Sequence, residues 1–164
     1  YIRDYTDELG QEDSEQLLLQ IVDDKEWMER LPSHIVLEKW RLVHAGYDPR
    51  KELDSQEEGT LLWIRKPFHT ATKPVDEERT VLFGHTPTMN LNKHLGAGKW
   101  GKPWYSKVEL NDGRPSSIGL DTCLFHEERQ PATLTAFNLQ TQEVLHVNRV
   151  ERWDEKIREQ VKEV

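Results

Sequence analysis

The sequence predicts a mixed α/β fold, and three of its features indicate this. Short apolar runs bounded by glycine, proline or polar turns are typical of buried strands, and the clearest lie at residues 40–43, 81–83 and 132–139. Apolar residues at helical spacing precede these runs, most clearly at residues 17–31. With 164 residues, the chain is long enough to bury a core. We therefore expect one main domain, residues 24–150, with smaller additions at both ends.

The composition excludes some classes of protein. A net charge of −8 argues against nonspecific nucleic-acid binding, because the phosphate backbone would be repelled. No apolar run is long enough to span a bilayer and no secretory signal opens the chain, so we expect a cytoplasmic protein without a membrane partner. Cys123 is the single cysteine, which rules out an intramolecular disulfide and fits a reducing compartment. The chain begins with Tyr1 rather than methionine, so we also expect an incomplete polypeptide.

The N-terminal part is expected to be acidic and helical. Residues 1–23 are predicted to form an arm or helix in which Asp13 and Ser14 are plausible N-cap residues. Helical spacing continues through Trp27 and Met28, which we expect to pack in the core rather than to contact a cofactor. The proline at position 32 then ends the helical pattern.

The middle of the chain is expected to alternate strands with loops. Residues 34–37 and 40–43 are predicted strands, and the two residues between them indicate a hairpin. Residues 60–65 form a short helical or irregular piece, and residues 80–83 form the most apolar strand. Residues 90–105 are rich in glycine, lysine and tryptophan, which predicts a surface loop able to shape a site.

The C-terminal part is expected to be mostly β. Short strands are predicted at residues 107–110 and 118–121, followed by longer ones at 132–139 and 143–147. The partial alternation in these longer strands is typical of a sheet covered on both faces. Residues 151–164 are predicted to form a charged helix with a thin apolar stripe.

Two histidines share one local design. His44 directly follows the strand at 40–43, and His85 follows the strand at 80–83 after a single glycine, Gly84. Strand ends hold side chains in a fixed direction, and neutral imidazole is a good ligand for zinc, manganese, iron and nickel. A packing role stays open for both residues, and two histidines alone do not complete a hydrolytic metal site.

Other polar residues carry weaker signals. Arg65 follows the apolar run LLWI and could bind a phosphate bidentately, although a surface salt bridge is the competing interpretation. Asp121 is a candidate contact near the site or a turn-stabilising residue, and we interpret Asp48 and Asp54 as loop acids. The remaining histidines are interpreted as surface or packing residues: His34, His69, His94, His126 and His146.

The order of short motifs adds a resemblance. The succession EWMERLP, VHAG, LLWIR, FGHTP, IGLDT and LTAFNL falls within the segment from Trp27 to Val147. In this order the motifs resemble the calcineurin-like metallophosphoesterases, and most closely the bacterial serine/threonine protein phosphatases. By position, His44 and His85 match metal ligands of that family, and Arg65 matches a phosphate-contacting arginine.

The resemblance implies both a fold and a reaction. The fold would be a four-layer α/β/β/α sandwich with mixed β-sheets, of which this chain would form the C-terminal portion. The reaction would be hydrolysis of phosphate monoesters by water activated by two divalent metal ions, manganese first, with iron, zinc and nickel as alternatives. The substrate would be a phosphoprotein or a small phosphoester.

The chain also departs from the family. The motifs GD-x-H-G, GD-x-x-D-R-G and GNH-[DE], which carry the family's other metal ligands and its acid–base residue, are absent, so no catalytic residue is assigned. Cys123 stands where the family usually has glycine. We therefore expect the 164 residues alone to be nearly inactive. Two alternatives stay open: a diadenosine-tetraphosphate-type hydrolase, and a catalytically dead binding module with this fold.

Overall fold

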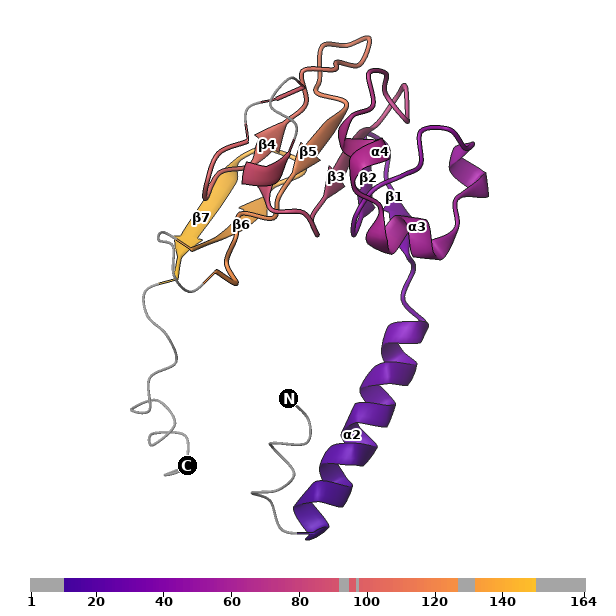
Figure 1. The fold of residues 1–164 in the computed structure, drawn as a ribbon, viewed down its shortest axis with the longest axis vertical. Helices are drawn as coiled ribbons and strands as arrows, with labels where there is room; N and C mark the ends of the chain where they lie inside the picture. The colour runs from indigo at the N-terminus through magenta and orange to yellow at the C-terminus, as the bar shows by residue number, and fades with distance from the viewer. Residues whose placement is uncertain (1–10, 92–94, 97, 127–131, 150–164) are drawn as a thin grey trace. The chain divides into compact units, whose positions relative to one another are not determined.

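The computed structural model describes residues 11–91, 95–96, 98–126 and 132–149 (Figure 1). The chain divides into two compact units, Tyr1–Pro32 and Ser33–Val164. The first unit contains helix α2, and the second contains every strand of the described residues. The predicted helix at residues 151–164 lies outside the described residues. No described helix has the length and apolar character needed to cross a membrane.

Helix α2, Gln11–Glu29, is one continuous helix. The N-cap prediction is wrong, because Asp13 and Ser14 already lie inside this helix. The predicted end before the proline is confirmed, since the amide of Leu31 closes the last turn on the carbonyl of Met28. Trp27 and Met28 are both more than half exposed, so the prediction that they pack in a core is wrong. Helix α2 has no second described element within its own unit to cover them.

The second unit is built on a five-stranded mixed sheet in the order β1-β2-β3-β5-β4. Its strands are β1 His34–Val36, β2 Trp40–Val43, β3 Thr80–Phe83, β4 Trp104–Tyr105 and β5 Ser117–Gly119. The central strands β2, β3 and β5 are parallel, and the two outer pairs are antiparallel (Figure 1). The predicted hairpin is confirmed, with its two-residue turn closed by a 2.8 Å hydrogen bond from the amide of Leu37 to the carbonyl of Trp40.

Alternate side chains of β2 and β3 enter two separate hydrophobic clusters, as strand geometry requires. On one face, the short helices α3, Glu58–Trp63, and α4, Lys66–His69, contribute Leu61 and Phe68 to the larger cluster. The strand residues of that cluster are Val43, Val81, Phe83 and Trp104. On the other face, the smaller cluster contains Trp40, Leu82 and Ile118, packed against Phe137 and Leu139.

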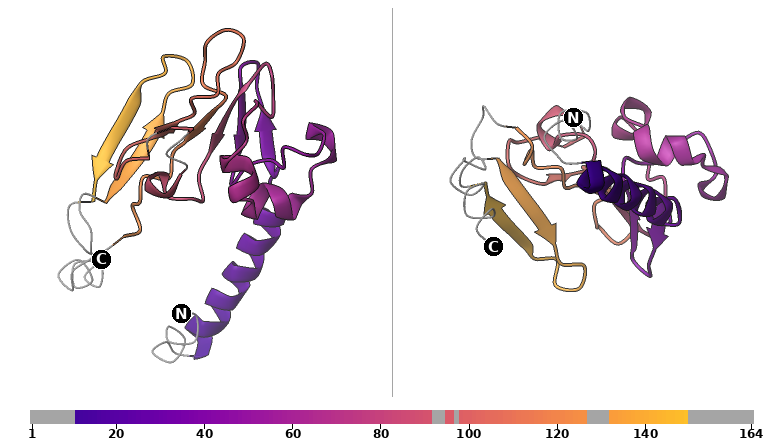
Figure 2. Two further views of the ribbon diagram at one scale, coloured as in Figure 1. Left: turned by 45° about the horizontal axis from the view of Figure 1, so that its top comes forward. Right: turned by 90° about the horizontal axis from the view of Figure 1, so that it is seen from below.

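A separate antiparallel hairpin, β6 Thr133–Phe137 and β7 Val144–Asn148, lies next to this smaller cluster (Figure 2). The ring of Phe137 meets Trp40 edge-on at 5.5 Å. Both predicted strands are confirmed, but the prediction that both faces are covered is wrong. One face presents exposed side chains, namely Leu134, Leu145 and Val147. The mixed α/β class is thus shown, whereas the four-layer sandwich stays a prediction.

Two further expectations are wrong in this unit. Residues 107–110 form no strand, and only an isolated bridge joins Glu109 to Pro115. The predicted surface loop at residues 90–105 instead supplies core side chains, because Leu91 and Trp104 are buried and Trp104 contacts Phe83 edge-on at 6.1 Å. These apolar side chains fill the space beside β3 that the short helices leave open.

Candidate functional site

The candidate site lies at the carboxyl ends of the parallel strands. Because β2, β3 and β5 are parallel neighbours, the residues that follow them meet at one edge of the sheet. His44 follows β2 directly, His85 follows β3 after Gly84, and Asp121 follows β5 after one residue. A 2.9 Å hydrogen bond from the Gly84 amide to the His44 carbonyl joins the first two strand ends.

The structure brings the two sequence-predicted histidines into contact. The Nε2 atom of His44 lies 3.2 Å from the Nδ1 atom of His85, and the ring centroids are 4.9 Å apart. Two nitrogen ligands bound about 2.0–2.1 Å from one zinc ion would be separated by about 2.9–3.4 Å, depending on the angle at the metal. The imidazole pair therefore has a spacing that fits two ligands of one metal ion as well as a hydrogen bond.

His85 is held in an unfavourable conformation. Its φ of 62° lies in the left-handed region, which costs a non-glycine residue roughly 1–2 kcal/mol. Its Nε2 atom is buried and makes no hydrogen bond within the described part of the chain. Backbone strain and an unsatisfied polar atom are tolerated most often where a side chain has a functional role.

The surroundings of His85 keep its ring neutral. Burial is the main cause that lowers the pKa of His85, and electrostatic interactions with Arg65 and His44 act in the same direction. The carboxylate of Asp121 opposes them by raising the pKa of His85. A neutral imidazole has a free lone pair, which is the form that binds metal ions.

The end of helix α3 adds two side chains beside His85. Trp63 meets the His85 ring edge-on at 5.4 Å and is 67% exposed. Arg65 is exposed and forms no ion pair with any described residue, so the competing interpretation as a surface salt bridge finds no support among these residues. Its charge lowers the pKa of both His85 and His69.

An open groove of about 550 Å³ continues from the histidine pair. One end of the groove is polar and is formed by His44, His85 and Asp121. The remaining lining is mainly apolar. It comes from the central strands and the residues after them, from the end of β6 and from the turn of the hairpin: Leu42, Val43, Leu82, Phe83, Gly84, Leu120, Phe137 and Leu139. The site therefore combines a small group of polar residues with a larger apolar surface.

The acidic candidates have structural roles in the described residues. The carboxylate of Asp121 accepts a 3.2 Å hydrogen bond from the Cys123 amide, which stabilises the turn after β5. Asp48 forms a two-point ion pair with Arg50, and Asp54 lies exposed in a single turn of 3-10 helix. Among the described residues, no three histidine, cysteine or carboxylate side chains lie close enough to hold a metal ion together.

His69 is a site-adjacent residue that the sequence did not single out. It is buried on α4, its ring stacks on Phe83 at 5.5 Å, and its Nε2 atom has no hydrogen-bond partner among the described residues. Burial is the main cause that lowers the pKa of His69 to about 4, helped by the positive charges of His85 and Arg65. The local sequence gives no signal for it, because a histidine in a short helix is as suitable for packing as for exposure.

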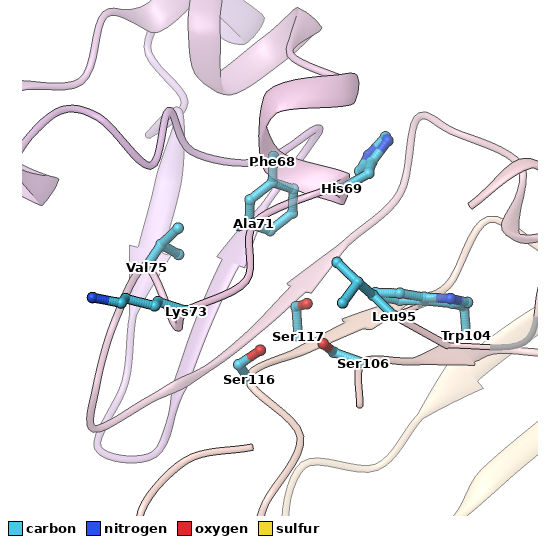
Figure 3. Close-up of a pocket in the computed structure, with 10 residues that line it drawn as sticks. All are labelled: Phe68, His69, Ala71, Lys73, Val75, Leu95, Trp104, Ser106, Ser116 and Ser117. Carbon is cyan, nitrogen blue, oxygen red and sulfur yellow. The ribbon is translucent and has the colours of Figure 1, made fainter. Parts of the chain in front are cut away.

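A second cavity lies on the other side of His69 and is too small for a substrate. Its volume is about 10 Å³, close to the space that one water molecule needs. Figure 3 shows Phe68 and His69 on α4 at one side, with Trp104 on the opposite, strand-bearing side. Three serines complete that side: Ser106, Ser116 and Ser117.

The other histidines have packing or surface positions, as predicted, except that His94 lies outside the described residues. His34 contacts Tyr47, His126 contacts Trp100 and Phe125, and His146 is exposed on β7.

Comparison with protein-family models, curated proteins and solved structures gave no match for this chain. The chemistry of the site is therefore inferred from its own geometry.

Proposed function

We propose that the chain carries part of a metal-dependent phosphoesterase site, in which His44 and His85 are metal ligands and Arg65 binds the phosphate. The observation that supports it is the 3.2 Å contact between two imidazoles at the ends of adjacent parallel strands. Arg65 has no ion pair among the described residues, and its charge lowers the pKa of His85, which suits the recognition of an anion. The four-layer metallophosphoesterase sandwich belongs to this proposal.

The residues of the chain have separate tasks in this site. The rings of His44 and His85 would hold a divalent ion, manganese first, with iron, zinc or nickel as alternatives. Bound metal ions supply charge stabilisation on the phosphoryl oxygens and lower the pKa of water. Arg65 would orient the phosphate through its planar guanidinium and offset its negative charge.

Two imidazoles do not hold a bridged pair of metal ions, so hydrolysis needs further carboxylate ligands. The described residues bring no third ligand to the pair. We therefore expect the 164-residue chain to bind metal and phosphate but to hydrolyse phosphoesters very slowly.

The substrate class that we propose first is a phosphoserine or phosphothreonine protein, with small phosphoesters as the alternative. A second function, a binding module without catalysis, is favoured by the same lack of a third ligand among the described residues. Both functions use the same histidines and arginine, so binding alone does not separate them. Hydrolysis of a phosphoester by the chain when a segment that supplies carboxylate ligands is added would favour the enzyme over the binding module.

Isothermal titration of Mn²⁺ into the chain tests the metal ligands. We expect His44→Ala and His85→Ala each to weaken binding about tenfold or more, because each removes one of two ligands. His146→Ala, which changes an exposed histidine outside the site, is the matched control and should leave binding unchanged. Equal affinities of the wild type and both site variants would overturn the proposal.

Titration with methylphosphonate, a phosphate-like anion that is not hydrolysed, tests Arg65 in the same way. Arg65→Ala should abolish this binding, whereas Arg30→Ala, at an exposed arginine directly after α2, should not. Rapid Mn²⁺-dependent hydrolysis of an aryl phosphate by the chain alone would contradict the view that the site lacks ligands.

A further inference from the structure

The rim of the site carries an exposed aromatic side chain that the fold does not use. Trp63 is the last residue of α3 and is 67% exposed. Its neighbours on the helix are the ones that pack: Leu61 is buried, and Ile64 lies against the larger hydrophobic cluster. A large aromatic surface in water is unfavourable, and an exposed tryptophan beside polar groups is typical of a binding surface.

The position of Trp63 connects it to the phosphate-binding groups. Its ring is perpendicular to that of His85, at 5.4 Å between centroids and an interplanar angle of 89°. Arg65 follows two residues later, and its charge also acts on His85. A phosphate bound between Arg65 and His85 would therefore place the group that it carries close to the indole.

We infer that Trp63 is a specificity-determining residue that stacks on a planar aromatic group of the substrate, so that the site prefers phosphoesters that carry an aromatic group near the phosphate. Within the proposed function, this favours small aromatic phosphoesters, the alternative substrate class, over phosphoserine and phosphothreonine. This inference rests on the proposed function, because it assumes that Arg65 and the histidines bind the phosphate. Stacking of an aromatic group on an aromatic side chain contributes enough for a preference of roughly tenfold over an aliphatic group. The aromatic group could be an aryl ring, as in phosphotyrosine, or a nucleobase, and both share the planar π surface that the indole recognises.

Calorimetric titration of the 164-residue chain in the presence of Mn²⁺ tests this inference. The probes are methylphosphonate, phenylphosphonate and adenosine 5′-monophosphate, of which only the last two carry an aromatic group. We expect at least one of these two to bind about tenfold more tightly than methylphosphonate, a difference of about 1.4 kcal/mol. Tight binding of phenylphosphonate alone would indicate an aryl ester, and tight binding of the nucleotide would indicate a nucleobase.

Three variants separate stacking from general loss of structure. Trp63→Leu keeps apolar bulk but removes the π surface, so it should abolish the preference and leave methylphosphonate affinity unchanged. Trp63→Phe should keep part of the preference. Trp27→Leu, the same change at an exposed tryptophan of α2, should keep all of it.

Each outcome has a separate consequence. Equal affinities for all probes, or a preference that survives in Trp63→Leu, would overturn the role of Trp63 and leave the proposed function standing. If no probe binds in a manner that depends on Arg65, the proposed function fails, and the inference fails with it.

Discussion

Protonation of His69 is expected to destabilise the fold in mildly acidic solution. The side chain is only 9% exposed, its ring stacks on Phe83, and its Nε2 atom has no partner among the described residues. Burial and the nearby positive charges hold its pKa at about 4, below the ordinary value of about 6.5. Because the unfolded chain binds this proton more readily, stability is highest above pH 6.5 and falls as the pH decreases toward 4.

The size of this effect follows from the two pKa values. Between about pH 7.5 and about pH 5, the shift corresponds to a loss of about 2 kcal/mol in the free energy of unfolding. The replacement His69→Phe keeps a ring against Phe83 but removes the group that binds the proton. Between the same two pH values, the free energy of unfolding of this variant should therefore fall by about 2 kcal/mol less than that of the wild type. Urea unfolding at several pH values measures both curves. Parallel curves for the wild type and His69→Phe would refute the reasoning, and His146→Phe, at an exposed position, should behave like the wild type.

Two further changes test the fold that supports the site. Asp76→Asn should destabilise the chain by roughly 3–5 kcal/mol in urea unfolding, because it leaves the buried guanidinium of Arg41 without its carboxylate partner. The control is Asp112→Asn, which changes an exposed carboxylate. Equal free energies of unfolding for Asp76→Asn and Asp112→Asn would contradict the prediction. His85→Gly should be more stable than His85→Ala by about 1 kcal/mol, since alanine keeps a Cβ atom in the left-handed region while both lose the imidazole. Equal stabilities of these two variants would show that the backbone at this position is not strained.

The sequence predicts most of the β structure because the signals are local. The strands at residues 34–37, 40–43 and 80–83 are apolar runs ended by turns, and the structure confirms them within one residue. Residues 90–105 were misjudged for a different reason. Their glycines indicate a loop, but Leu91 and Trp104 fill a gap beside β3 that exists only once the sheet and helices are assembled. The burial of a loop side chain is a tertiary property that local patterns do not contain.

Some residues of the candidate site could be predicted from the local sequence, and others depend on the tertiary structure. His44 and His85 could be predicted because each follows a strand, and parallel pairing of those strands brings them to one edge. Trp63 and His69 could not be recognised from the sequence, since a tryptophan or histidine in a short helix is as suitable for packing as for exposure. Only the structure shows that Trp63 is exposed beside His85, whereas His69 is buried beside Phe83.

The combination of backbone strain with an unsatisfied polar atom argues for function at His85. Buried polar atoms without a partner in the described residues also occur away from the histidine pair: His34 Nδ1, Tyr47 Oη, His69 Nε2 and Trp104 Nε1. At the site, His85 Nε2 and Thr86 Oγ1 are buried without a partner in the described residues, and His85 also has a strained backbone. Each unsatisfied group costs about 1–3 kcal/mol. Packing can offset this cost at a structural residue. Among the described residues with an unsatisfied buried polar atom, His85 alone also has a left-handed backbone, and this added strain favours a binding role for it.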